Sequence, residues 1–160
     1  MRTVNVKPRL LVLTSTFPRW LDDSEPPFVF ELSRRLTGSF DVTVLAPRAP
    51  GSQRKESMAG LHVIRFPYFI PRWENLAAHG GGILNRLKAN KLNYLLIPFF
   101  IAGQIWALTQ LLRRESFDII HAHWIIPQGL VAILGHYLAS QNIPIVCTSH
   151  GGDLYALRNP

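Results

Sequence analysis

Short apolar runs alternate with longer segments of helical period along almost the whole chain, and this order constrains the fold more than any other feature. Apolar or β-branched runs favour buried strands, whereas apolar positions three or four residues apart favour helices. Parallel strands need crossovers, and right-handed crossovers place helices on both faces of the sheet. The sequence therefore predicts an α/β fold, a Rossmann-like doubly wound parallel sheet. The strand-like runs are residues 10–14, 41–46, 61–66, 118–121 and 143–149.

Helices and loops are expected between these runs. Helices are predicted over residues 28–36 and 129–140, and a long loop over residues 15–27, where three prolines interrupt any regular period. Residues 49–60 are polar and without helical period, which predicts another loop. The first helix should turn Ser33 and its basic neighbours away from the sheet. Its sheet-facing positions are expected to be Phe28, Leu32 and Leu36.

Length and composition predict one domain over residues 1–160. A chain of this size with 48% hydrophobic residues can bury a core without metal or disulfide. The single cysteine, Cys147, excludes a disulfide within the chain. Lys and Arg number 17 against 10 Asp and Glu, and the resulting net charge of +7 favours anionic partners.

The same sequence bears on nucleic acid as a partner and on whether the protein is exported or cytoplasmic. The basic residues form no dense stripe and no recognisable reading module, so nucleic acid is not an expected partner. The apolar run near the N-terminus is too short for an export signal, which predicts a cytoplasmic protein.

Residues 92–112 contain no charged side chain, and three interpretations of this segment stay open. It is long enough to span a bilayer, although it falls where the fold needs the crossover helix between the third and fourth strands. Alternatively it is a core helix that packs on the sheet. The stretch from Arg86 to Leu112 could also lie on anionic lipid as a basic amphipathic surface, which is compatible with core packing by its later half. The expected core positions are Ile101, Ile105, Leu108 and Leu112.

Three loops carry most of the side chains suited to binding or chemistry. In the usual strand order 3-2-1-4-5, ligands bind beyond the carboxyl ends of the strands, where the order reverses between the first and fourth strands. The loops after the first, fourth and fifth strands should therefore line one crevice. The candidate residues in these loops are Trp20, Asp22, Asp23, His123, Trp124, His150, Gly151, Gly152 and Asp153.

The residue types in these loops indicate their chemistry. His150 stands at a strand tip as a catalytic or substrate-binding histidine, and the two glycines after it let backbone N–H groups approach an anion. Asp153 is expected to cap the following helix. Trp20 could stack on a sugar ring, and the carboxylates of Asp22 and Asp23 could orient hydroxyl groups or act as a base. A solvated acidic loop is the alternative.

Metal and cofactor sites are not expected. His121 and His123 lie two residues apart and point to one face of a strand, but no neighbouring Cys or Asp/Glu cluster supplies further ligands. No Gly-x-Gly-x-x-Gly follows the first strand, which argues against a dinucleotide cofactor. Neither a P-loop nor a Gly-x-Ser-x-Gly nucleophile elbow is present.

Taken together, three stretches resemble the N-terminal, acceptor-side half of GT-B glycosyltransferases of the retaining family 4 type. They contain LLVLTSTFPRW, FDIIHAHWIIPQG and IPIVCTSHGGDLYALR, and they follow the order of that family over almost the whole chain. The resemblance implies a hexosyltransferase-like enzyme that moves a sugar from a nucleotide-sugar donor to an acceptor with retained anomeric configuration.

The resemblance also implies roles for single residues. His150 would contact the donor sugar and help to stabilise the transition state, while His123 and the loop around Asp22 would meet the acceptor. The turn after the fifth strand would be shaped by Gly151, Gly152 and Asp153. Two features depart from the family pattern. The loop after the first strand lacks a Gly-Gly pair, and no glutamate is followed by another eight residues later.

These features together predict a glycosyltransferase domain in cell-surface polysaccharide or glycolipid synthesis. The nucleotide-sugar-binding second domain is expected to be absent from these residues, so the isolated chain should be inactive and a separate donor-binding domain is an expected partner. A sugar or lipid-linked acceptor would place the protein peripherally on the inner face of the membrane. The alternative is a non-catalytic module that binds a lipid-linked sugar at the membrane surface or docks a separate subunit.

Overall fold

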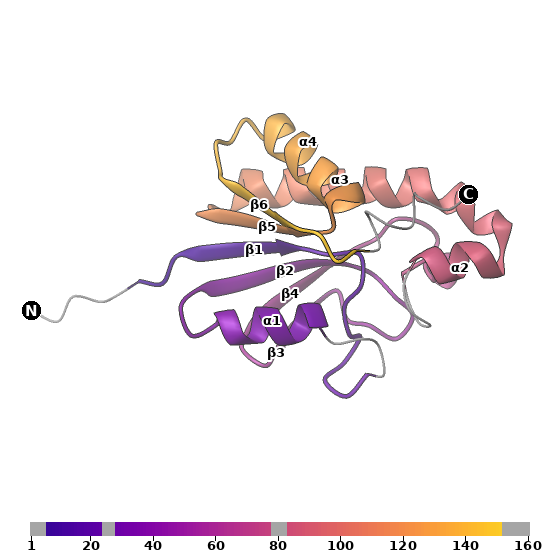
Figure 1. Cartoon of the computed structure of the whole chain (residues 1–160), viewed down its shortest axis with the longest axis horizontal. Helices are drawn as coiled ribbons and strands as arrows, with labels where there is room; N and C mark the ends of the chain where they lie inside the picture. Colours follow the sequence, from indigo (N-terminus) through magenta and orange to yellow (C-terminus); the bar gives the residue numbers. More distant parts are fainter. Residues whose placement is uncertain (1–5, 24–27, 78–82, 152–160) are drawn as a thin grey trace, which may run out of the picture.

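The computed structural model describes residues 6–23, 28–77 and 83–151, and these residues form a six-stranded sheet with helices on both faces (Figure 1). The strands run in the order β3-β4-β2-β1-β5-β6. Every neighbouring pair is parallel except β3 and β4. The five parallel strands confirm the predicted order and the Rossmann-like class. The strands are β1 (Arg9–Leu13), β2 (Asp41–Pro47), β3 (Lys55–Met58), β4 (Leu61–Phe66), β5 (Ile119–His123) and β6 (Ile145–Thr148).

The helices divide between the two faces of this sheet. In Figure 1, α1 lies on one face, whereas α3 and α4 lie side by side over the other. Between β4 and α3, the chain forms a group of short helical segments at one end of the sheet. The helical elements are α1 (Phe28–Leu36), η1 (Pro71–Trp73), α2 (Ile83–Ala89), η2 (Lys91–Leu96), α3 (Ile97–Arg114), η3 (Ile125–Gly129) and α4 (Leu130–Leu138).

The central strands are buried on both faces because alternate residues point to opposite sides. Leu11 and Leu13 of β1 belong to the core beneath α3 and α4, together with Leu108 of α3. Leu10 and Val12 belong to the second core, beneath α1. Both cores are continuous apolar clusters, as expected for a doubly wound sheet.

The sheet-facing side of α1 differs from the prediction. Val29, Phe30 and Ser33 are buried, whereas Phe28 and Leu32 are exposed. Both sets of positions fit helical spacing, so the periodicity alone did not discriminate between them. Packing selects the observed face because Phe30 meets the ring of Phe17 edge-on, with 5.8 Å between ring centroids.

The predicted polar loop over residues 49–60 contains the edge strand β3, which corrects the sequence-based expectation. β3 pairs antiparallel with β4 through a tight hairpin, in which Ala59 and Gly60 both have positive φ, at 50° and 82°. Positive φ at both central residues is typical of a type I′ turn, which matches the twist of the two strands. The run KESM has little strand propensity, so its pairing with β4 decides its conformation.

The long uncharged segment forms η2 and α3, and its core-helix interpretation is confirmed. Leu108 and Leu112 are buried, and Ile101 and Ile105 pack partly buried against the core. Among the described residues, one helix, Lys91–Arg114, is long and apolar enough to cross a membrane by length and composition. This helix is partly buried against the core, and α3 contacts both β2 and β4.

Candidate functional site

The candidate site lies at the carboxyl ends of β5 and β6, beside β1, where the strand order reverses. Trp124 follows β5 with a positive φ of 76°, and Gly151 follows β6 with a φ of 83°. The backbone N–H of Trp124 donates to the carbonyl oxygen of Thr148 at 2.8 Å, which ties the two strand ends together. The turns after both strands are therefore held side by side at the carboxyl end of the sheet.

His123 and His150 form a hydrogen-bonded pair across these two strand ends. Nδ1 of His123 lies 2.9 Å from Nε2 of His150, and the two ring planes differ by only 4°. His123 is fully buried, and its Nε2 atom has no hydrogen-bond partner within the described part of the chain. Burial, reinforced by the charges of His121 and His150, lowers the pKa of His123 to about 3. The His123 imidazole is therefore neutral at physiological pH.

His121 lies two residues before His123 and shares its face of β5, as the spacing predicts. The two ring centroids are 4.3 Å apart. Nε2 of His121 is 2.8 Å from the hydroxyl of Thr148 on β6. Burial, with a smaller contribution from His150, also lowers the pKa of His121. Three imidazoles thus stand together, and the surroundings of His121 and His123 favour the uncharged forms of these two rings.

Two aromatic side chains flank the His150 ring. The centroid of Phe28 lies 4.7 Å from that of His150, and the centroid of Trp124 lies 5.0 Å from it. Phe28 belongs to the first turn of α1, so this helix also contributes to the site. The Phe28 side chain is 41% exposed because its ring packs against His150 and not between α1 and the sheet. A partly apolar enclosure strengthens hydrogen bonds made by the imidazole.

Gln128 is a site residue that the sequence analysis did not select. It is completely buried in η3. With its amide oriented to satisfy both neighbours, the nitrogen donates to the His123 carbonyl oxygen at 3.2 Å and the oxygen accepts from the Ser15 N–H at 3.3 Å. It therefore joins the ends of β5 and β1. A lone amide in the apolar run IIPQGL was the available signal, because buried polar side chains need partners.

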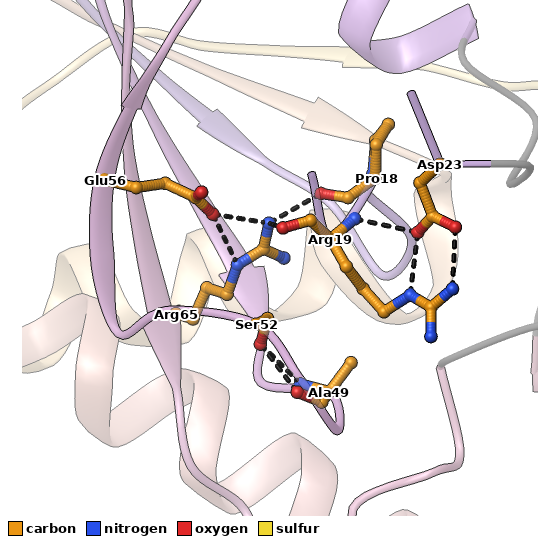
Figure 2. Close-up of polar contacts among 7 residues, drawn as sticks. All are labelled: Pro18, Arg19, Asp23, Ala49, Ser52, Glu56 and Arg65. Atoms are coloured by element: carbon orange, nitrogen blue, oxygen red, sulfur yellow. Dashed lines mark hydrogen bonds and ion pairs between the residues drawn. The ribbon is translucent and has the colours of Figure 1, made fainter. Parts of the chain in front are cut away.

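The loop after β1 makes a separate group of contacts. The guanidinium of Arg19 binds both carboxylate oxygens of Asp23, with Nε–Oδ2 at 2.8 Å and Nη2–Oδ1 at 2.7 Å (Figure 2). The same guanidinium lies 4.0 Å from the ring of Trp20, which is 44% exposed. The Asp23 side chain is only 1% exposed, so its carboxylate is engaged within the loop. Asp22, by contrast, is exposed.

The structure thus brings together some of the candidate residues. His123, Trp124 and His150 meet at the ends of β5 and β6, whereas Trp20 and Asp23 contact Arg19 on the loop after β1. The N–H of Gly151 donates to the Ser149 hydroxyl at 3.3 Å. Gly152 and Asp153, including the predicted helix cap, lie outside the described residues.

No group of three or more His, Cys, Asp or Glu side chains that could hold a metal ion occurs among the residues that the structure describes. The cluster formed by His121, His123 and His150 can nevertheless donate or accept hydrogen bonds at the carboxyl end of the sheet. Such an arrangement suits the recognition of hydroxyl groups and the stabilisation of a developing charge by oriented dipoles.

Comparison with known proteins identifies a family that this chain matches. Residues 9–160 match the family described as "Glycosyl transferase 4-like domain". The chain is also 36% identical over 73 residues to "N-acetyl-alpha-D-glucosaminyl L-malate synthase" of Bacillus anthracis, a match covering 46% of this chain and 19% of that protein. It is 29% identical over 100 residues to an uncharacterized glycosyltransferase of Methanocaldococcus jannaschii, covering 61% of this chain and 25% of that protein. The matched part of the chain therefore spans a quarter or less of the length of these curated relatives.

Proposed function

This chain belongs to the glycosyl transferase 4-like family, and on that premise we propose that it is the acceptor-side half of a GT-B enzyme. The enzyme transfers a sugar from a nucleotide-sugar donor to an acceptor with retention of the anomeric configuration. The observation that carries this proposal is the His123–His150 pair at the strand-order reversal. A second domain, in the same polypeptide or a partner, holds the nucleotide.

In this mechanism, His150 contacts the donor sugar. The sequence-based expectation that His123 meets the acceptor is corrected, because His123 is fully buried; its role is to position His150 through their hydrogen bond. The hydrogen bond between the two rings sets the plane of His150 and fixes which of its nitrogens carries a proton. Because His123 stays neutral, it adds no positive charge beside the sugar as the leaving group departs and the anomeric carbon becomes electron-poor. His150 then stabilises the transition state through a hydrogen bond with a fixed direction.

The acceptor side of the site is the loop after β1 together with the turn after β5. Trp20 presents an aromatic face suited to a sugar ring, and Asp22 presents an exposed carboxylate. The Bacillus anthracis relative is named for a product that joins N-acetylglucosamine to L-malate. A small hydroxy acid is therefore one acceptor class to test, and a lipid-linked sugar is the other.

Sugar transfer by the natural polypeptide that carries these residues tests the proposal. The purified protein is incubated with UDP- and GDP-sugars and with L-malate or polyprenyl-phosphate-linked acceptors, and products are identified by mass spectrometry. His150→Ala should lower kcat/KM by about 100-fold or more, because it removes a contact strengthened in the transition state. His62→Ala removes an exposed imidazole near the start of β4, at the end of the sheet opposite the site, and should retain wild-type activity.

The proposal is contradicted for these donors and acceptors if the folded wild-type protein gives no sugar product. Wild-type activity in His150→Ala would contradict the assigned role of that residue. The 160-residue chain by itself should give no more than trace transfer, because the donor domain is supplied elsewhere.

We also propose peripheral attachment to the inner face of an anionic membrane, which would bring a lipid-linked acceptor to the site. Exposed apolar and basic side chains occur together on and beside the short helical segments η1, α2 and η2 and at the start of α3, and we call this set the basic apolar surface. Its members are Ile70, Arg72, Trp73, Lys88, Lys91, Leu92, Leu95 and Phe99, all exposed. The rings of Phe69 and Phe99 lie 5.1 Å apart and join the η1 side to α3.

Charge and position support this attachment. Glu74 is the only acidic residue in the sequence between residues 57 and 114, and it is buried. Basic residues beside exposed apolar side chains favour anionic lipid surfaces. In Figure 1, α2 lies beyond the end of the sheet at which β1 terminates, the same end that carries the histidine pair. Attachment through this surface would therefore direct the site toward the lipid.

A further inference from the structure

Arg65, near the end of β4, is an arginine that the proposed reaction does not use. The residue is 2% exposed. Arginine is almost never buried to this degree unless its charge is paired. Burial lowers the pKa of Arg65, while the hydrogen bond and charge of Glu56 act in the opposite direction. The guanidinium must therefore be stabilised by specific partners.

Its partners come from two separate parts of the chain (Figure 2). Glu56 on β3 accepts from Nη2 at 2.9 Å and from Nε at 3.1 Å. The carbonyl oxygen of Pro18, in the loop after β1, accepts from Nη2 at 2.6 Å. Arg65 thus links the edge strand to the loop across a sequence separation of 47 residues.

The loop that Arg65 holds is a preformed unit. Asp23 accepts from the Arg19 side chain and also from the Arg19 backbone N–H at 2.9 Å. At the loop's beginning, the hydroxyl of Thr14 donates to the carbonyl oxygen of Thr16 at 2.7 Å. These bonds set the shape of the loop, but they do not attach it to the sheet at Pro18. Phe17 packs in the core against Phe30 just before this point, and Arg65 supplies the polar attachment at Pro18 itself.

The energetics of buried ion pairs favour a positioning role for Arg65. Apolar residues in place of a buried ion pair are often neutral for stability. An apolar pair at residues 56 and 65 could therefore hold β3 against β4, but it would leave the Pro18 carbonyl without this donor.

We propose that Arg65 is a positioning residue, which fixes the loop after β1 through Pro18 and so sets where Trp20 stands for the acceptor. The link to the acceptor rests on the proposed function. The effect of Arg65 on the position of the loop does not rest on it, because that position can be measured without any sugar. Trp20 packs on Arg19 directly beside Pro18, so release of Pro18 should change the environment of its ring.

The test uses the full chain labelled with 5-fluorotryptophan and observed by fluorine NMR. The sequence has four tryptophans, and each resonance is assigned with a Trp→Phe variant. The double variant Arg65→Met/Glu56→Leu replaces the ion pair by apolar side chains. The Trp20 resonance should move toward its position in urea, while those of Trp73, Trp106 and Trp124 stay in place. Amide hydrogen exchange across residues 15–23 should accelerate about tenfold, as expected for loss of one tethering hydrogen bond.

A matched control removes an ion pair from the other end of the sheet. Arg9 binds Glu115 at 2.5 Å, and Arg9→Met/Glu115→Leu should leave the Trp20 resonance and the exchange of residues 15–23 unchanged. Should the Arg65→Met/Glu56→Leu chain fail to fold, Arg65→Lys supplies the decisive measurement. Lysine keeps a cation for Glu56 but lacks the rigid planar guanidinium that reaches Glu56 and the Pro18 carbonyl in one fixed geometry.

The positioning role is overturned if a folded variant, with its other three tryptophan resonances unmoved, retains the wild-type Trp20 resonance and exchange. In the natural polypeptide, Arg65→Lys should raise KM for the acceptor at least threefold with kcat nearly unchanged. An unchanged KM beside a displaced Trp20 would refute the link to the acceptor while leaving sugar transfer itself intact.

Discussion

At the scale of single residues, the histidines of the site have different surroundings despite their proximity. His123 is fully buried, whereas His150 is partly exposed beside Phe28 and Trp124. The two rings share a hydrogen bond, so a change in the protonation of one must affect the other. The pH dependence of stability reports this coupling without a substrate.

Acidification should destabilise the protein through His123. Its pKa is about 3 in the folded chain and about 6.5 when unfolded, so the unfolded chain binds more protons between these values. Stability supplied by the neutral ring is therefore present above pH 6.5 and is lost progressively toward pH 3. Between pH 7.5 and 5.5 this residue should cost about 1.4 kcal/mol of unfolding free energy. Urea unfolding at the two pH values measures it.

His123→Asn should reduce this pH-dependent loss, even if the variant is less stable at both pH values. An undiminished loss in His123→Asn would show that the titration belongs elsewhere, with His121 as the first alternative because burial lowers its pKa too.

At the scale of elements, α3 approaches the chain after β4 unusually closely at Gly103. A Cβ atom placed there would lie 2.8 Å from the carbonyl oxygen of Pro67 and 3.1 Å from Cβ of Tyr68. A backbone carbonyl cannot move aside as a flexible side chain can. The glycine therefore lets α3 lie against the segment that leads toward the basic apolar surface.

Gly103→Ala should destabilise the protein by about 1–2 kcal/mol. Overpacking costs about 1–3 kcal/mol, and the better helix propensity of alanine returns up to about 1 kcal/mol. Urea unfolding gives the difference. Gly38→Ala is the matched control, because the nearest atom to its added Cβ would be 3.8 Å away. Equal stability of the two variants would contradict the steric account of this contact.

At the scale of the whole molecule, the distribution of charge matters more than its sum. The net charge of +7 is spread over the chain, but the basic apolar surface combines cations with exposed Leu92, Leu95 and Phe99. Exposed apolar patches bordered by charge commonly mark interaction surfaces. Lipid binding by this surface can be measured independently of sugar transfer.

The protein should co-sediment with vesicles containing phosphatidylglycerol at low salt and bind weakly to phosphatidylcholine vesicles. Each basic residue near an anionic surface contributes about 1 kcal/mol, so Lys88→Glu/Lys91→Glu should reduce the partition coefficient at least tenfold. Arg113→Glu/Arg114→Glu makes the same charge change at the far end of α3 and should have a smaller effect. Equal losses in both variants would indicate a response to net charge and would contradict a defined surface.

Several features of the fold were predictable because they depend on local pattern. The apolar runs identified five parallel strands, and the strand order usual for a doubly wound sheet is the order observed. The spacing of His121 and His123 predicted their common face on β5. The face of α1 was predicted wrongly, since two sets of positions had helical spacing and only the contact of Phe30 with Phe17 separated them. The assigned substrate roles of Trp20, Asp22 and His150 stay predictions.

The sequence by itself determined the α/β class and, with the strand order usual for that class, the end of the sheet at which the candidate loops meet, because hydrophobic periodicity is a local property. Only the tertiary structure decided that β3 exists, that Glu56 reaches Arg65, and that Gln128 joins the ends of β1 and β5. These features depend on partners distant in sequence. A weak strand former or a buried polar group is stable only once the folded chain supplies its hydrogen bonds.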